Sequence, residues 1–250
     1  MRKLSRYFAA SVLAVSLSFN TTAGQAADLS KDQTKAVEKI VHDYIVAHPE
    51  VLIEAMAALD AKESAAKKKA QDSAIAKNRA AIYNDPTSFV AGNPKGDVTI
   101  VEFFDYNCGY CKRAVGPLLD TVAKDGNVRL ILKELPILGP SSVTASHAAL
   151  AAVKQGKYMA LYKAFYAHKG PLDDEAVFNI AADTGLDIKK LSKDMMDPAI
   201  ATIIKRNEDL SDALRISGTP AFIIGDQLYA GAQDADDLAA AIKLARANKS

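Results

Sequence analysis

Both cysteines of this 250-residue chain lie in one short stretch, "FFDYNCGYCKRA", where Cys108 and Cys111 are separated by Gly109 and Tyr110. Such a pair could close a structural disulfide, supply half of a metal site, or form a dithiol that is oxidised and reduced in turn. A disulfide across two residues closes so short a loop that it removes little entropy from the unfolded chain. A chain of this length also buries a core large enough to fold without a covalent link. A structural role is therefore disfavoured.

A metal site would need further ligands. Structural zinc usually takes four protein ligands, and the sequence has neither a second Cys-x-x-Cys nor a closely spaced pair of histidines. We interpret the histidines as surface or capping residues. Cu(I) accepts two soft thiolates, so it is the metal that stays compatible with Cys108 and Cys111 alone. The four histidines are His42, His48, His147 and His168.

The residues around the pair favour redox chemistry. The segment "DVTIVEFF", residues 97–104, has the β-branched and aromatic composition of a buried strand. Residues 109–124 have a helical pattern interrupted at Gly116-Pro117, which places Cys108 at a helix N-terminus. Free N–H groups and the helix dipole favour a thiolate at that end of a helix. We expect Cys108 to be the nucleophile and Cys111, one turn later and more buried, to be the resolving thiol.

In these motifs the chain resembles the DsbA-like branch of the thioredoxin superfamily over residues 89–249. After the cysteine pair come a second strand at residues 127–135, a helical block at 141–215, and Gly218-Thr219-Pro220 before a hairpin at 221–231. The resemblance implies an α/β, thioredoxin-like fold with a helical insertion over about 141–215. It also implies that Pro220 has a cis peptide bond facing the cysteine pair, and that the backbone of Thr219 pairs with an extended substrate.

Two charged residues interrupt the predicted strands, Glu102 and Lys133. Burying either charge would be costly without a partner. In DsbA-like proteins an acid and a lysine near these positions assist proton transfer to the resolving thiol, so the resemblance implies that role for Glu102 and, as a possible proton relay, for Lys133. The alternative is that either side chain reaches solvent at a strand edge.

The N-terminus predicts export. Residues 1–27 combine a basic start, a short apolar segment and small residues suited to signal-peptidase cleavage, and the apolar segment is too short to span a bilayer. We therefore expect a periplasmic protein. Loss of Arg2, Lys3 and Arg6 would change the formal net charge from +1 to −2, which gives no electrostatic reason to expect nucleic acid as a partner.

Residues 28–83 form a different region, with two apolar helical stripes followed by an alanine-rich and charged segment. Residues 84–97 are the predicted linker to a catalytic domain at 98–250. A helix with a narrow apolar stripe has to bury that stripe, either by self-association, which we favour, or by packing back onto the same chain. The region resembles the N-terminal stalk of ScsC-type, copper-tolerance-linked members of the family, so we expect a homo-oligomer and favour a trimer.

The resemblance also suggests the direction of the redox work. Gly109-Tyr110 and Thr219 look like the residues of DsbC-type isomerases, which favours isomerase or reductase activity without a cofactor. Exported cysteine-containing proteins would be the substrates, and a DsbB-, DsbD- or ScsB-like membrane protein would reset the pair. A plain dithiol oxidase and a Cu(I)-binding protein that uses the same two thiols are the alternatives.

Overall fold

The computed structural model describes residues 29–248, and the predicted signal peptide lies outside them. The chain divides into two compact units, residues 1–60 and residues 61–250. In the described part of the first unit are α1 (Lys31–Ala47) and the start of α2 (Glu50–Lys77). Among residues 29–248, no helix is long and apolar enough to cross a bilayer.

The first unit is helical, as its apolar pattern predicts. The capping residue is Ser30, whose Oγ accepts a hydrogen bond from the Gln33 N–H at 3.3 Å while its own N–H donates to Gln33 Oε1 at 2.9 Å. No residue of α1 is buried. The apolar stripes of both helices are exposed in the single chain, and they comprise Val37, Ile40, Val41, Tyr44, Leu52, Ile53, Met56 and Leu59.

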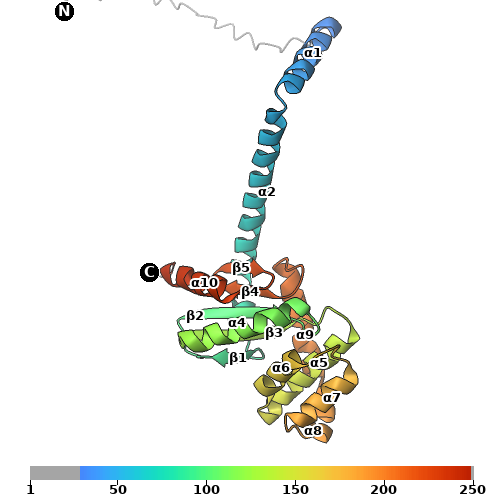
Figure 1. Cartoon of the computed structure of the whole chain (residues 1–250), viewed down its shortest axis with the longest axis vertical. Helices are drawn as coiled ribbons and strands as arrows, with labels where there is room; N and C mark the ends of the chain where they lie inside the picture. The colour runs from blue at the N-terminus through green and yellow to red at the C-terminus, as the bar shows by residue number, and fades with distance from the viewer. Residues whose placement is uncertain (1–28, 249–250) are drawn as a thin grey trace, which may run out of the picture. The chain divides into compact units, whose positions relative to one another are not determined.

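The second unit has one mixed sheet with helices on both faces (Figure 1). The strand order is β1-β3-β2-β4-β5, and only the central pair, β2 and β3, is parallel. Both central strands are buried on both faces, which explains their nearly continuous apolar sequences. The strands are β1 (Phe89–Gly92), β2 (Val98–Phe104), β3 (Val128–Glu134), β4 (Ala221–Ile224) and β5 (Gln227–Ala230).

The helices of this unit include a group of four, α5 to α8, that lies together beside the sheet (Figure 1). This group and α9 correspond to the helical insertion predicted at about 141–215. The helices are α3 (Arg79–Tyr83), α4 (Gly109–Asp125), α5 (Pro140–Ala152), α6 (Tyr158–Ala167), α7 (Asp174–Asp183), α8 (Ile188–Met195), α9 (Pro198–Ala213) and α10 (Ala235–Ala247), with a 3-10 turn at Val153–Gln155.

Alternation along the strands separates two cores. One core contains Ile100, Phe104 and Leu132 together with both cysteines, and residues of α4 to α10 complete it. We call this side of the sheet the cysteine face. The other core, on the far face, contains Val101 and Phe103. It also contains Ile75 from α2, Ile82 from α3, Leu210 from α9 and Leu214, the C-cap residue of α9.

Three predicted boundaries differ from the structure. Residues 84–97 were expected to be a linker before the catalytic domain, yet they contain β1, which pairs with β3 in the sheet. The end of α2 and all of α3 were expected to be part of a stalk at residues 28–83, yet Ile75 and Ile82 are buried in the far-face core and the second unit begins at residue 61. The predicted break at Gly116-Pro117 is also wrong, because α4 continues through Pro117. It ends at Gly126, whose φ of 71° suits a residue without a Cβ.

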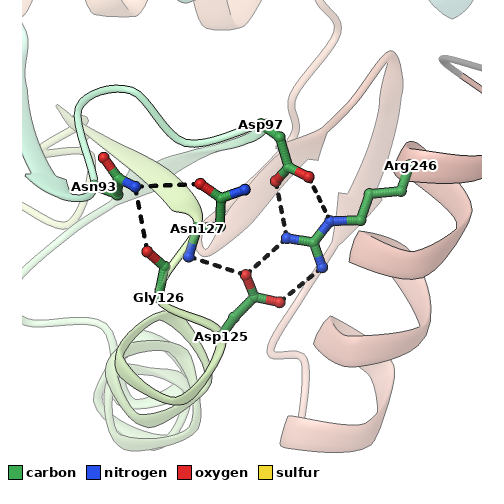
Figure 2. Close-up of polar contacts among 6 residues, drawn as sticks. All are labelled: Asn93, Asp97, Asp125, Gly126, Asn127 and Arg246. Atoms are coloured by element: carbon green, nitrogen blue, oxygen red, sulfur yellow. Dashed lines mark hydrogen bonds and ion pairs between the residues drawn. The ribbon is translucent and has the colours of Figure 1, made fainter.

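Arg246 of α10 contacts the loop before β2 and the end of α4 (Figure 2). Its guanidinium donates to Asp97 Oδ1 and Oδ2, each at 2.8 Å, and to Asp125 Oδ1 and Oδ2 at 2.7 and 2.8 Å. A neighbouring bond from the Asn127 N–H reaches Asp125 Oδ1 at 3.2 Å. The Arg246 hydrogen bonds lower the pKa of Asp125. One side chain of α10 thereby joins the loop before β2 to the end of α4.

We predict that Arg246→Ala lowers the free energy of unfolding at pH 7 by about 1 kcal/mol, the scale of a bidentate ion pair that solvent partly screens. A carboxyl with a depressed pKa stabilises the fold above its unfolded pKa, near 3.9, and the effect is lost as pH falls through the folded pKa. The difference between wild type and variant should therefore shrink between pH 7 and pH 3 in urea unfolding. Lys243→Ala, which removes an exposed cation from the same helix, is the control. A difference that is independent of pH would contradict the prediction.

Candidate functional site

Cys108 is the N-cap residue of α4, as predicted. Its Sγ accepts a hydrogen bond from the Cys111 N–H at 3.4 Å, and its own N–H donates to Asp105 O at 3.1 Å. Both cysteines are free thiols. The sulfur therefore lies where a helix presents unpaired N–H donors, which stabilise a negative charge.

The Gly218-Thr219-Pro220 motif lies beside the cysteine pair. Thr219-Pro220 is a cis peptide bond, and the Cys108 thiol donates to Thr219 O at 3.2 Å, although the two residues are 111 positions apart. The site therefore combines the start of α4 with the turn before β4. A hollow of about 270 Å³ beside it is lined by Tyr110, Gly218 and Thr219, among others.

The second cysteine is inside the protein. Cys111 is 0% exposed, against 6% for Cys108. Burial raises the pKa of the Cys111 thiol well above its ordinary value, and the charge of Glu102 acts in the same direction. The backbone N–H of Asp105 opposes this shift by hydrogen-bonding to the sulfur. Cys111 is thus a protonated thiol at neutral pH, while Cys108 is closer to solvent.

Glu102 lies on the cysteine face and is 0% exposed. Its Oε2 accepts a hydrogen bond from the Tyr162 hydroxyl at 2.9 Å, and its Oε1 has no partner within residues 29–248. Burial raises the pKa of Glu102 to about 8. The Tyr162 hydroxyl interacts electrostatically with both Glu102 and Cys111. The structure therefore brings this acid to the resolving thiol and excludes the alternative of a solvent-exposed strand edge.

Lys133 lies elsewhere. In the register of the parallel pair, Lys133 is next to Phe103 on the far face, and its Nζ donates to Ser88 Oγ at 2.9 Å and lies 3.7 Å from Asp85 Oδ2. Burial lowers the pKa of Lys133 to about 8. The sheet separates it from the cysteine pair, so the placement expected of a proton relay is wrong for this residue.

Glu134 was missed by the sequence analysis. It is buried on the cysteine face and accepts hydrogen bonds from the hydroxyls of Tyr158 at 2.7 Å, Ser146 at 2.8 Å and Tyr106 at 3.1 Å. Burial raises its pKa to about 8. The available signal was the strand period of two, since Glu134 is two residues after Leu132 and four after Leu130, both in the same core.

Asp105 and Asn107 were also missed. The carboxylate of Asp105 is buried and accepts hydrogen bonds from the Asn107 N–H and Ser142 Oγ, both at 2.7 Å. The Asn107 amide donates to Ser142 Oγ and Ser141 Oγ, each at 3.1 Å. The signal was an Asx turn directly before the first cysteine.

The dipeptide between the cysteines is less constrained. A Cβ on Gly109 would meet nothing within 4 Å, so sterics do not require glycine there. Tyr110 is 60% exposed, and the Arg113 guanidinium stacks over its ring with Cζ 4.1 Å from the centroid. These residues border the site without contributing a buried polar group.

Within residues 29–248 no group of three or more His, Cys, Asp or Glu side chains could hold a metal ion.

Fold and site together define a thioredoxin-like protein with a Cys-x-x-Cys pair at a helix N-terminus and a cis-proline turn beside it. Residues 84–244 match the family model described as "Thioredoxin", and residues 33–66 match the "Copper resistance protein ScsC N-terminal domain". The chain belongs to the thioredoxin family, in its DsbA-like, ScsC-type branch.

Solved structures agree with this assignment. A thioredoxin-like oxidoreductase from Silicibacter pomeroyi is 43% identical with a TM-score of 0.67, and the match covers 69% of this chain and 99% of that one. A linker-deletion mutant of Proteus mirabilis ScsC is 33% identical with a TM-score of 0.68, covering 90% and 100%. The thiol-disulfide exchange protein alpha-DsbA2 from Wolbachia pipientis is 32% identical with a TM-score of 0.67, covering 72% and 97%.

Curated relatives include a protein of a different overall kind. The Na(+)/H(+) antiporter NhaA 1 of Salinispora arenicola is 29% identical over 155 residues, which is 61% of this chain and 24% of the antiporter. The chain therefore spans about a quarter of the length of the curated relatives it matches.

We predict that Glu102→Gln changes the pH dependence of stability. A carboxyl whose folded pKa is about 8 binds its proton more tightly in the folded state, so stability falls as pH rises from the unfolded pKa, near 4.3, to about 8. The glutamine variant lacks this loss. Its free energy of unfolding relative to wild type should rise between pH 5 and pH 9 by roughly 2 kcal/mol or more, measured by urea unfolding of the reduced proteins. Glu63→Gln, on an exposed part of α2, should show no such change. If plots of the free energy of unfolding against pH are parallel for Glu102→Gln and wild type, Glu102 is not a buried acid that titrates in this range.

Proposed function

We propose that this protein is a periplasmic thiol:disulfide oxidoreductase that exchanges disulfides with exported cysteine-containing polypeptides through Cys108 and Cys111. The observation that carries the proposal is the asymmetry of the pair. Cys108 is at the helix N-terminus beside the Thr219 carbonyl, whereas Cys111 is fully buried and the charge of Glu102 raises its pKa further. A nucleophile and a resolving thiol need these two different environments.

In the reducing direction, the Cys108 thiolate attacks one sulfur of a substrate disulfide, and the other substrate sulfur leaves as a thiolate. Cys111 then loses its proton and attacks Cys108 Sγ, which breaks the mixed disulfide and releases the second substrate thiolate. Two electrons pass from the cysteine pair to the substrate. Oxidation of a substrate dithiol is the reverse.

Glu102 serves the second step. The raised pKa of the Cys111 thiol makes its deprotonation the difficult event, and the Oε1 atom of Glu102, which has no partner among residues 29–248, is an acceptor on the same face. With a pKa of about 8, Glu102 is ionised in a minor fraction of molecules at neutral pH. The role assigned to it is to accept the Cys111 proton and return it in the reverse reaction.

Isomerase or reductase character is the finer part of the proposal. It is supported by the Gly109-Tyr110 dipeptide, by Thr219 before Pro220, and by the exposed apolar stripes of α1 and α2. Association of those stripes, with a trimer favoured, would present several cysteine pairs to one misfolded substrate. A membrane protein of the DsbB, DsbD or ScsB type would reset the pair.

Cu(I) binding by the same thiols is the second candidate. It is favoured by the presence of two neighbouring thiols and by the match of residues 33–66 to the N-terminal domain of the copper resistance protein ScsC. Titration of the reduced protein with Cu(I), run beside insulin reduction, separates the two. Tight Cu(I) binding without insulin reduction would favour a copper protein.

The thiol roles predict different phenotypes. Cys108→Ser should abolish insulin reduction, because no nucleophile remains. Cys111→Ser should trap mixed disulfides with substrate that non-reducing gels reveal. In the wild type, iodoacetamide should modify Cys108 much faster than Cys111, which is buried. Equal modification rates, followed by peptide mass spectrometry, would contradict the assignment.

The N-terminal helices should determine assembly. Deleting residues 28–60 should leave a folded monomer, since Ile75 and Ile82 still cover the far face of the sheet. The monomer should keep dithiol exchange and lose most refolding activity on scrambled ribonuclease. The double change Ile40→Glu and Ile53→Glu tests the same idea in the full mature chain, because it puts charges in the exposed stripes. Light scattering gives the mass, and a monomeric wild type would refute the assembly.

A further inference from the structure

Asn107, the residue directly before Cys108, holds a loop of the helical insertion. Its Oδ1 accepts a hydrogen bond from the Leu172 N–H at 3.1 Å, and its Nδ2 lies 3.4 Å from Leu172 O. Leu172 lies between α6 and α7 and is buried in the cysteine-face core. The Asn107 amide thus pairs with both backbone groups of one loop residue, as a neighbouring strand would.

The same amide reaches a second part of the insertion. Nδ2 donates to Ser141 Oγ and Ser142 Oγ in the first turn of α5. One side chain therefore joins the turn before the cysteine pair to the start of α5 and to the α6–α7 loop. Such a link over 34 and 65 positions of sequence fixes the insertion relative to the nucleophile.

Lys112 holds the other end of this loop. Its Nζ donates to the backbone oxygen of His168, which follows α6. Asn107 and Lys112 directly flank the Cys-Gly-Tyr-Cys motif, so the loop at residues 168–172 is bound on both sides of the motif. Between the two attachments the loop is exposed at Lys169, Gly170 and Pro171.

We propose that Asn107 and Lys112 are positioning residues that hold the loop at 168–172 as a wall of the polypeptide-binding site and so favour polypeptide substrates over small thiols and disulfides. The inference rests on the proposed oxidoreductase function. A loop that is already ordered costs less conformational entropy when an extended chain binds against it. On this proposal a small thiol or disulfide does not need the loop in order to react with Cys108, so its reaction gains nothing from the two attachments.

The test compares two substrates in each variant. The oxidised protein is assayed with reduced, unfolded ribonuclease and with reduced glutathione. Asn107→Ala should lower kcat/KM for ribonuclease at least tenfold, mainly through KM, and change the glutathione rate less than twofold. Asn207→Ala is the matched control, because Asn207 is a buried amide that donates to Glu134 O at 3.0 Å and has no hydrogen bond to the motif or the loop among residues 29–248. It should leave the ratio of the two rates unchanged.

Lys112 gives an independent variant at an exposed position. Lys112→Met should shift the ratio in the same direction by a smaller factor, and Lys112→Arg, which keeps a donor and the charge, should restore it. An unchanged ratio in both Asn107→Ala and Lys112→Met, or equal losses on both substrates, overturns the proposal; if Asn107→Ala fails to fold, Lys112→Met decides alone. A wild type that reacts with neither substrate would overturn the proposed function itself.

Discussion

The hydrogen bonds of Asp105 fix the turn on which the cysteine pair depends. Its carboxylate is buried, and a buried carboxylate is tolerated only where donors replace the lost water. Three donors do so: the Asn107 N–H, Ser142 Oγ and the Leu138 N–H at 2.9 Å. Its backbone also serves the site, because the carbonyl accepts from the Cys108 N–H and the Tyr166 hydroxyl. One residue thereby sets where α4 begins and which atoms of the insertion lie next to it.

Two further acids are buried on the cysteine face, and they differ in how well they are satisfied. Glu134 accepts three hydroxyl hydrogen bonds, whereas Glu102 accepts one and keeps an oxygen without a partner among residues 29–248. Full satisfaction suits a structural role for Glu134, which joins β3 to α5 and α6. An unused acceptor on the same face as a buried thiol, as in Glu102, suits the proposed proton exchange. The number of hydroxyl groups around each carboxyl therefore distinguishes two acids of the same type on the same face of the sheet.

Much of the fold follows from local sequence signals. The β-branched segment before the cysteines, the helix start at Cys108 and the late Thr219-Pro220 motif are each visible without a structure. The face of a strand residue is harder, because β3 is apolar on both sides and its pattern does not say which residues point to the cysteines. The parallel register pairs Phe103 with Lys133, which puts Glu102 and Lys133 on opposite faces.

The end of α2 escaped prediction for a related reason. Its sequence is alanine-rich and charged. Within the described residues, Ile75 is the one buried side chain of α2 and Ile82 the one buried side chain of α3, and both belong to the far-face core. Isolated apolar residues give no periodic signal. The hydrogen bonds from the Asn107 side chain to Leu172 could not be predicted either, because they involve backbone atoms of Leu172. Any residue type at position 172 would offer a backbone carbonyl, so the sequence does not indicate the contact.

The bond between the Cys108 thiol and Thr219 O connects the redox state of the pair to substrate binding. The reduced thiol has a proton to donate, and it occupies the Thr219 carbonyl at 3.2 Å. A thiolate or a disulfide sulfur has none, so the carbonyl is released when Cys108 ionises or is oxidised. If a substrate N–H paired with the Thr219 carbonyl, as the family resemblance implies, the thiol would not compete for that acceptor in the states that react. The contact therefore works against binding of substrate to the neutral thiol, the form of Cys108 that cannot carry out exchange.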